Sequence, residues 1–198
     1  MFYDAVKNDH GFQYDPFKAI VVPRPIGWVS SVSAEGFVNL APFSYFNAVS
    51  QAPHYIVLGI GAGKDSLRNI EATGEFAVNM ATWDLREQMN ATSAHVPHEV
   101  DEFDIAGLTR APCRMIRPPR VGESPACLEC RLHQITPLPD DDGKAEDCMV
   151  LGRVVGIHID DRFIRDGRVD TAAMRPIARL GYSEYATVSE AWRMRRPD

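Results

Sequence analysis

The residues best suited to chemistry form a short block, GAGKDS at residues 61–66, between an apolar run and a helix-like segment at residues 67–73. A helix that begins at Asp65 or Ser66 as its N-cap presents unpaired backbone amides. Those amides, the Lys64 ammonium and the Ser66 hydroxyl can together hold one terminal phosphate through charge and the helix dipole. From the spacing alone, a capped surface helix is the competing interpretation.

The same block does not match a nucleoside-triphosphate loop. In the pattern G-x-x-x-x-G-K-[ST], the first glycine would fall at position 58, which is Leu58. The residue after Lys64 is Asp65, where that pattern needs a magnesium-binding hydroxyl. The sequence therefore favours a single phosphate group over ATP.

A second polar group lies upstream, on a predicted β-hairpin. The runs at residues 26–33 and 37–50 meet across a short Gly-containing connection at residues 34–36, which is typical of antiparallel neighbours. Small polar side chains stand where buried strands usually carry Val or Ile: Ser30, Ser31, Ser33, Asn39 and Ser44. We expect free amides along residues 28–31 and 39–44 to satisfy the edge of a planar heteroaromatic ring. Ordinary polar strand positions are the alternative.

Arg24 lies between Pro23 and Pro25, neither of which can donate a backbone hydrogen bond. A side chain held in such a rigid turn loses little freedom when it engages a partner. Arg24 is therefore a candidate anion contact, and a plain surface arginine is the alternative.

The sequence gives little support for a metal site or for a catalytic nucleophile. Cys127 and Cys130 match C-x-x-C, but no second pair follows and the surrounding residues alternate like a strand, on which they face opposite ways. His95 and His98 have no third ligand at suitable spacing. No G-x-S-x-G turn and no assignable His/Asp pair is present. If there is catalysis, we expect a cofactor to carry it.

The elements that position these groups are mainly strands. Besides the hairpin, we predict strands at residues 17–22, 55–60, 75–80, 124–138 and 148–159, a helix at residues 83–91, and a long polar loop at residues 92–104. Acidic residues fill the turn at residues 139–147. Consecutive strands joined by short turns are typical of an antiparallel barrel. We expect one domain, with an arm at residues 1–14 and a tail at residues 189–198.

Composition and charge restrict the binding partners and the cellular location that we expect. The chain has 198 residues and a formal net charge of -6, which argues against generic binding to nucleic acid or to a membrane surface. The N-terminus lacks the apolar run of a signal peptide, and no stretch reaches the length of a membrane span. These features predict a cytoplasmic protein.

Several blocks in order resemble the flavin reductase-like proteins, which bind FMN on a split β-barrel and include flavoredoxins and the reductase components of two-component monooxygenases. The blocks are PRPIGWVSSVSAEGFVNLAPFSYFN, GKDSLRNIEATGEFAVN, VDEFDIAGLT, ESPACLECRL, VLGRVVGIHID and RPIARLGYSEY. The resemblance covers roughly residues 15–188. It implies a mainly β fold with minor α content, a six-stranded antiparallel Greek-key barrel with flanking helices, and a homodimer with FMN near the subunit interface.

The resemblance also implies roles for individual residues. Four residues of the first strand would border the flavin: Trp28, Val29, Ser30 and Ser31. Four on the second strand would contact the isoalloxazine edge, largely through the backbone: Asn39, Leu40, Ala41 and Ser44. Lys64, Asp65 and Ser66 would lie at the phosphate, with Arg24 as a further contact. Arg179 and Tyr182 would close the site.

The activity implied by the resemblance is hydride transfer from NADH or NADPH to FMN, or to FAD, followed by electron delivery to a monooxygenase or another acceptor. An FMN electron carrier of the flavoredoxin type, without NAD(P)H turnover, is the main alternative. A flavin-dependent oxidase of the pyridoxamine-phosphate type would need further basic residues that we do not place. No dinucleotide fingerprint distinguishes NADH from NADPH.

Overall fold

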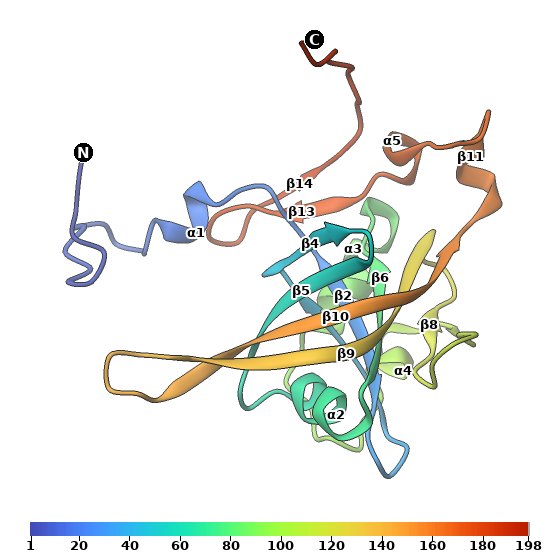
Figure 1. The fold of residues 1–198 in the computed structure, drawn as a ribbon, viewed down its shortest axis with the longest axis horizontal. Coiled ribbons are helices and arrows are strands. Elements are labelled where there is room, and N and C mark those ends of the chain that lie inside the picture. The colour runs from blue at the N-terminus through green and yellow to red at the C-terminus, as the bar shows by residue number, and fades with distance from the viewer. Residues whose placement is uncertain (198) are drawn as a thin grey trace.

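The computed structural model describes residues 1–197, and its centre is a seven-stranded antiparallel sheet (Figure 1). The strands lie in the order β3-β2-β6-β9-β10-β5-β4. Their bounds are β2 (Gly27–Val32), β3 (Val38–Phe43), β4 (Phe46–Gln51), β5 (His54–Gly61), β6 (Glu75–Met80), β9 (Ala126–Pro139) and β10 (Ala145–Ile159). The expectation of a mainly β fold built on a large antiparallel sheet is confirmed.

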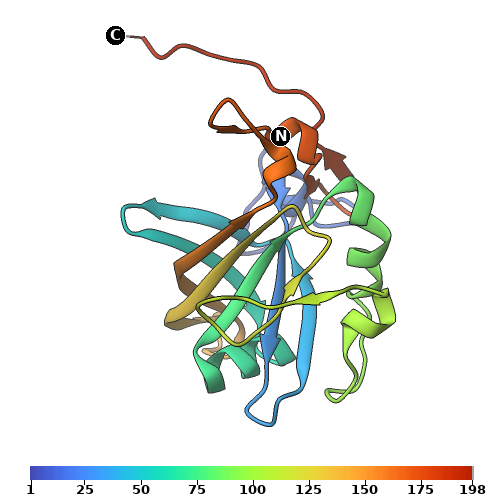
Figure 2. The same ribbon diagram turned by 90° about the vertical axis from the view of Figure 1, so that its right-hand side faces the viewer.

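Helices and minor strands surround this sheet. The helical segments are α1 (Phe17–Ile20), α2 (Asp65–Thr73), η1 (Trp83–Leu85), α3 (Arg86–Ala91), α4 (Glu102–Ala106), η2 (Asp161–Phe163) and α5 (Thr171–Met174). A three-stranded sheet joins β1 (Arg24–Pro25), β13 (Ile177–Arg179) and β14 (Tyr185–Thr187). Two small hairpins pair β7 (Arg110–Ala111) with β8 (Arg120–Val121) and β11 (Ile164–Arg165) with β12 (Arg168–Val169). Figures 1 and 2 place α2 at one end of the main sheet and β13 and β14 at the other.

The first strand of the predicted hairpin and its connection are confirmed. The second strand, predicted at residues 37–50, ends earlier than expected, at Phe43. β2 pairs with β3 from Gly27↔Phe43 to Val32↔Val38. The chain then bends at Ser44 and Tyr45, and β4 pairs with β5 at the far edge of the sheet. The main sheet thus has seven strands instead of the expected six, and within the described chain no pairing joins β3 to β4 to close it.

The two edge strands differ in how they are covered. Along β3, the helix α4 packs against the strand, and the Leu40 amide donates to the Glu102 carboxylate at 2.9 Å. Along β4, the pairing with β5 shifts register between Ala48 and Ser50, which marks a β-bulge or similar irregularity. One edge is therefore protected by a helix and the other is irregular.

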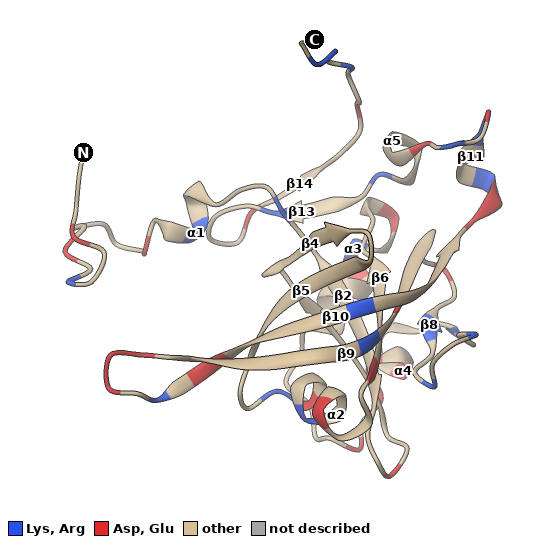
Figure 3. Cartoon of the chain, viewed as in Figure 1, with Lys and Arg blue, Asp and Glu red and all other residues tan. Residues whose placement is uncertain are grey.

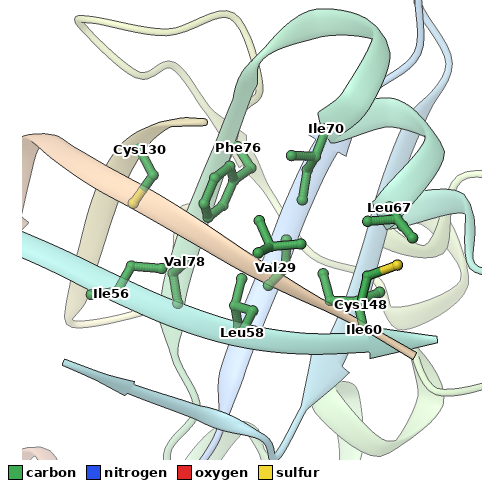
Figure 4. Packing of buried hydrophobic residues seen from close by; sticks show 11 residues of the cluster. Val29, Ile56, Leu58, Ile60, Leu67, Ile70, Phe76, Val78, Cys130 and Cys148 are labelled. Carbon is green, nitrogen blue, oxygen red and sulfur yellow. The ribbon is translucent and has the colours of Figure 1, made fainter. Parts of the chain in front are cut away.

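The main core lies between the strands and α2, as Figure 4 shows. Leu67 and Ile70 of α2 pack on side chains from five strands: Val29, Ile56, Leu58, Ile60, Phe76, Val78, Cys130, Cys148 and Val150. A Cβ at Gly152 on β10 would collide with the Phe76 ring. The absence of a side chain at Gly152 therefore makes room for Phe76.

The prediction that residues 17–22 begin the sheet is wrong. They form the short helix α1 and an irregular connection, and Figure 1 shows this segment away from the main sheet. The Arg24 guanidinium accounts for the difference, because it takes the carbonyls of Lys18 and Val21 that a strand would need for pairing. Residues 1–14 contain turns and bends with mostly exposed side chains, and the described part of the tail, residues 189–197, is irregular and exposed.

The acidic connection between β9 and β10 is a solvated turn. Its carboxylates gather at the tip of the long hairpin in Figure 3. The Asp140 side chain accepts from the amides of Asp142 at 3.0 Å and Lys144 at 2.8 Å, and Gly143 adopts a positive φ of 82°. These local hydrogen bonds account for the turn.

The other sequence predictions compare closely with the structure. β6 has the predicted bounds, η1 and α3 together cover the predicted helix at residues 83–91, and β9 and β10 contain the two long predicted strands almost entirely. Among residues 1–197, no helix combines the length and the apolar character needed to cross a bilayer.

Candidate functional site

A cavity of about 440 Å³ lies where β3, the end of β5 and the start of α2 meet. Three segments that the sequence singled out line it: the second strand of the hairpin, the GAGKDS block, and the polar loop after α3. Glu146 of β10 adds to the wall. The lining residues are Asn39, Ala41, Pro42, Phe43, Gly61, Ala62, Gly63, Lys64, Asp65, Ser66, Thr92, Ser93, Ala94, His95, Val96, Glu102 and Glu146. The structure thus brings together five of the predicted site residues: Asn39, Ala41, Lys64, Asp65 and Ser66.

The start of α2 differs from the prediction by one residue. Lys64 is the N-cap, with an extended backbone at φ -86° and ψ 139°, and no side chain caps the helix. The predicted caps, Asp65 and Ser66, are the first two helical residues. Their amides belong to the first-turn groups for which a helix has no internal acceptor, so they are available to an anion.

The Ser66 hydroxyl is held in place by the hairpin. Asn39 of β3 donates its side-chain amide to Ser66 Oγ at 2.8 Å, and both residues are buried. One turn further along α2, the Asn69 side chain donates to Ser31 Oγ at 3.2 Å, while Asn69 Oδ1 is buried without a partner within the described chain. These contacts fix α2 against β2 and β3.

The electrostatics of the cavity combine one available cation with several carboxylates. Lys64 is exposed, and its ammonium forms no ion pair among residues 1–197. Asp65 is paired with Arg68 at 2.5 Å and lies 3.5 Å from His98 Nδ1, and Glu146 is paired with Lys144 at 2.7 Å. Two of the three lining carboxylates are thus partly balanced, and Lys64 is left to attract an anion.

The third carboxylate, Glu102, is one that the sequence analysis missed. It is 5% exposed and accepts the Leu40 amide at 2.9 Å, which satisfies the outward amide of β3. Burial raises the pKa of Glu102, and the hydrogen bond from Leu40 opposes that effect only in part. The available signal was the sequence VDEF: Asp101 caps α4 by accepting the Phe103 amide at 2.8 Å, which places Glu102 on the first turn.

We expect Glu102→Gln to change the pH dependence of stability. When the pKa of Glu102 is higher in the folded state than in the unfolded state, the carboxyl group stabilises the fold at a pH below its unfolded pKa, about 4.3. That contribution is lost as the pH rises through the folded-state pKa. Glutamine stays neutral and can still accept the Leu40 amide. The melting temperature of the variant relative to wild type should therefore rise with pH in thermal scans between about pH 4 and about pH 8.

The exposed Glu99 provides the control for this experiment. Glu99→Gln should shift the melting temperature by a similar amount at every pH. A pH-independent difference for Glu102→Gln would contradict the assignment of a raised pKa to this carboxyl group.

The first strand of the hairpin lies behind the cavity instead of lining it. Trp28, Val29, Ser30 and Ser31 are each fully buried. β2 pairs with β3 on one side and with β6 on the other through residues 27–30, so the free amides expected along residues 28–30 are engaged in the sheet. The expectation of an accessible amide row on this strand is wrong because β2 is an interior strand.

These buried side chains hold neighbouring loops instead. Trp28 Nε1 donates to Thr92 Oγ1 at 2.9 Å and so fixes the start of the loop that lines the cavity. Ser30 Oγ donates to the Pro119 carbonyl at 2.5 Å. Trp28 and Ser30 therefore support the loops around the sheet.

A second, more apolar groove of about 770 Å³ adjoins the bend after β3. Ala41, Pro42 and Phe43 line the first cavity, whereas Ser44 lines this groove together with Tyr45 and Phe46. Arg24 lines it as well. The predicted residues on the second strand are thus distributed between two adjacent hollows, and Leu40 points its buried side chain into a separate apolar cluster.

Arg24 is buried, and its guanidinium donates to three carbonyls, those of Lys18 at 2.5 Å, Val21 at 2.6 Å and Leu180 at 2.8 Å. These bonds connect α1 to the segment after β13. Arg24 Nε has no partner within the described chain. The geometry shows a residue that organises the groove wall, and an anion would have to compete with the carbonyls for its donors.

The two histidines of the polar loop have different surroundings. His95 lines the cavity. His98 lies beside Asp65 and meets the Phe37 ring edge-on at 5.5 Å between centroids. The resemblance also placed Arg179 and Tyr182 at the site, but they line neither hollow. The Arg179 guanidinium donates to the Tyr185 hydroxyl and to the Tyr182 carbonyl.

The two cysteines of the C-x-x-C motif lie where the strand alternation placed them. All four, Cys113, Cys127, Cys130 and Cys148, are free thiols. Cys130 packs in the main core, and Cys127 packs in a separate cluster with Ala77 and Ile116. The C-x-x-C pair therefore lies on opposite faces of β9, as the strand alternation predicted.

A family model described as "Flavin reductase like domain" matches residues 20–172. An uncharacterised protein of Halalkalibacterium halodurans is 35% identical over 182 residues, which cover 89% of this chain and 87% of that protein. The protein belongs to the flavin reductase-like family, and the resemblance inferred from the sequence is confirmed.

Solved structures show the same fold. Nitrilotriacetate monooxygenase component B from Bacillus cereus superposes with a TM-score of 0.91 at 30% identity, covering 98% of each chain. The 2-nitrobenzoate 2-nitroreductase NbaA of Pseudomonas fluorescens gives 0.87 at 28% identity, covering 100% of this chain and 96% of that one. A flavoredoxin of Desulfovibrio vulgaris (Miyazaki F) gives 0.78 at 19% identity, covering 88% and 91%, which shows a shared fold alone.

Proposed function

We propose that this protein binds FMN with its phosphate at the start of α2 and acts as an NAD(P)H-dependent flavin oxidoreductase. The observation that carries the proposal is the uncapped N-terminus of α2 beside the unpaired Lys64 ammonium, at the mouth of a cavity in a chain of the flavin reductase-like family. FAD is the alternative flavin for the same site.

The residues present fit a terminal phosphate. Gly63 has open space where a Cβ would stand, so an anion can approach the backbone closely. Lys64 supplies charge, the amides of Asp65 and Ser66 supply donors, and Asn39 orients the Ser66 hydroxyl. Asp65 itself is turned toward Arg68 and His98, which reduces its repulsion of an anion.

The ring of the cofactor would extend along β3 toward the bend. Ala41 lines the first cavity and Ser44 the adjoining groove, which supports a ring bordered by residues 41–44. FMN bound there would supply the redox chemistry for electron transfer from NADH or NADPH to an acceptor. The chain itself binds, orients and shields, because positioning reacting groups supplies much of the acceleration in such a transfer.

A homodimer is part of the proposal. The apolar groove beside Ser44 is lined by Phe17, Ile20 and Val21, all of which are exposed in the single chain. An apolar surface of this kind is typical of a protein interface. A second copy seated there would complete the wall of the cofactor site.

The physiological partner that we propose is a flavin-dependent monooxygenase or another electron acceptor. The support is the similarity to nitrilotriacetate monooxygenase component B, which is described as part of a monooxygenase. A cytoplasmic location is supported by four free cysteines, since thiols stay reduced in that compartment.

Anaerobic mixing tests the activity. When the protein with bound FMN is mixed with NADH or NADPH under nitrogen, we expect prompt bleaching of the visible flavin band, at a rate well above that of free FMN under the same conditions. The comparison of the two nicotinamides identifies the preferred donor. Persistence of the oxidised spectrum with both donors would support an FMN electron carrier of the flavoredoxin type instead.

A further inference from the structure

A thiol, a carboxylate and an imidazole converge at a place remote from the cavity. Cys113 lies in the connection between β7 and β8, Glu129 on β9 and His158 on β10. Their ligand atoms all lie within 4.8 Å of one another. None of the three lines the cavity or the apolar groove, so the proposed flavin chemistry leaves this cluster unexplained.

Glu129 is fixed at the centre of the cluster. It is 1% exposed, and its carboxylate accepts the amides of Arg114 at 2.9 Å and Met115 at 2.6 Å as well as a bond from His158 Nε2. Burial alone would raise the pKa of Glu129, but these donors hold it below its ordinary value. A buried anionic oxygen therefore faces the histidine.

The backbone leaves room for this carboxylate. Gly156 of β10 is the register partner of Glu129, and a Cβ at Gly156 would lie 3.1 Å from the Glu129 carboxyl carbon. A glycine at position 156 thus allows Glu129 to stay in its place over the neighbouring strand.

A second thiol completes the surroundings. Cys127 lies two residues before Glu129 on the same strand and is the register partner of His158. Alternation along β9 puts Cys127 and Glu129 on one face. The half-buried Cys113 packs against the small apolar cluster that contains Cys127. Two sulfur atoms, one nitrogen and one carboxylate are therefore gathered from three segments.

We propose that Cys113, Glu129 and His158 form a binding site for a divalent metal ion of the zinc class, with Cys127 or water as the fourth ligand. Sulfur, imidazole nitrogen and carboxylate oxygen are the ligands that zinc takes in proteins, at about 2.3, 2.0 and 2.1 Å respectively. Small side-chain movements bring the three atoms to those distances from a common centre.

The ion would replace the direct contact between His158 Nε2 and the Glu129 carboxylate. The amides of Arg114 and Met115 would stay bonded to the carboxylate and orient it, as outer-shell donors do at metal sites. The His158 side chain is 21% exposed, which opens the cluster to ions from solvent.

Cobalt titration tests the site. The full-length protein, treated with a chelator, desalted and kept under a thiol-free reductant at about pH 8, a pH at which thiols can ionise, is titrated with Co²⁺ and followed by absorbance. We expect saturation at one equivalent, with a sulfur-to-cobalt charge-transfer band and visible bands of tetrahedral coordination. Cys113→Ser should weaken the charge-transfer band, and His158→Gln should abolish tight binding.

Two variants provide matched controls. His133→Gln changes an exposed histidine on the same strand as Glu129, and Cys148→Ala removes a thiol of the main core. Both should keep the cobalt spectrum and its stoichiometry. The proposal is overturned if the folded wild type shows no saturable cobalt spectrum, or if Cys113→Ser and His158→Gln, shown to be folded by circular dichroism, leave the spectrum unchanged.

Discussion

Replacing Lys64 by alanine should raise the Kd for FMN while leaving the Kd for riboflavin nearly unchanged. The two ligands share the ring and the ribityl chain, and only FMN has the phosphate. A charge-assisted hydrogen bond is worth about 1.5–3 kcal/mol. Because Lys64 is exposed, we expect the lower end, about 1.5 kcal/mol or roughly a tenfold change in Kd.

Quenching of flavin fluorescence on titration measures both constants. The matched control is Lys7→Ala, a lysine of the N-terminal segment that is paired with Asp4 and lies far from α2 in the sequence. It should leave both affinities at the wild-type level. If Lys64→Ala lost the same affinity for FMN as for riboflavin, the assignment of the phosphate to this helix start would be wrong. In the wild type, the difference in affinity between FMN and riboflavin should shrink as salt is added.

Replacing Phe76 by alanine should lower the free energy of unfolding by about 3–5 kcal/mol. The Phe76 ring is completely buried in the main core and lies over Gly152 of β10, where no side chain can fill the space that the substitution leaves. The neighbouring strands are fixed by pairing on both sides, so they can close the resulting cavity only in part. Urea unfolding followed by circular dichroism measures the loss.

Phe12→Ala is the control for the core substitution. Phe12 is 53% exposed in the N-terminal segment, so we expect a change within about 0.5 kcal/mol. A loss at Phe76 no larger than that at Phe12 would mean that the ring contributes little to the core. Because Phe76 lies outside the cavity wall, the folded fraction of the variant should keep its affinity for FMN.

Much of the fold could be predicted because alternation and turn residues act locally. β6 and the connection at residues 34–36 follow from such patterns. α1 could not be predicted in this way, because its carbonyls are taken by Arg24, whose other bond goes to Leu180, far along the chain. The division between β3 and β4 also depends on long-range pairing, since β4 joins β5 at the opposite edge of the sheet.

The part of the candidate site that lies in one local stretch could be predicted, and the part that depends on long-range contacts could not. Lys64 and Ser66 lie two positions apart in the sequence, and a helix start explains how they act together. The VDEF pattern can place Glu102 on the first turn of α4, but the burial of its carboxylate against Leu40 is a long-range contact that the local pattern does not reveal. The family resemblance placed Trp28 and Ser30 at the flavin, and free amides were expected along their strand. The pairing of β2 with β6 engages that strand on its second side, and this long-range contact is not visible in the local sequence.

The irregular pairing of β4 affects how readily other protein molecules can pair with this edge of the sheet. A straight outermost strand offers its unsatisfied amides and carbonyls as a template on which other molecules can stack into fibrils. The register shift between Ala48 and Ser50 interrupts that template near the middle of the strand. This irregularity therefore makes the β4 edge a poorer template for such stacking.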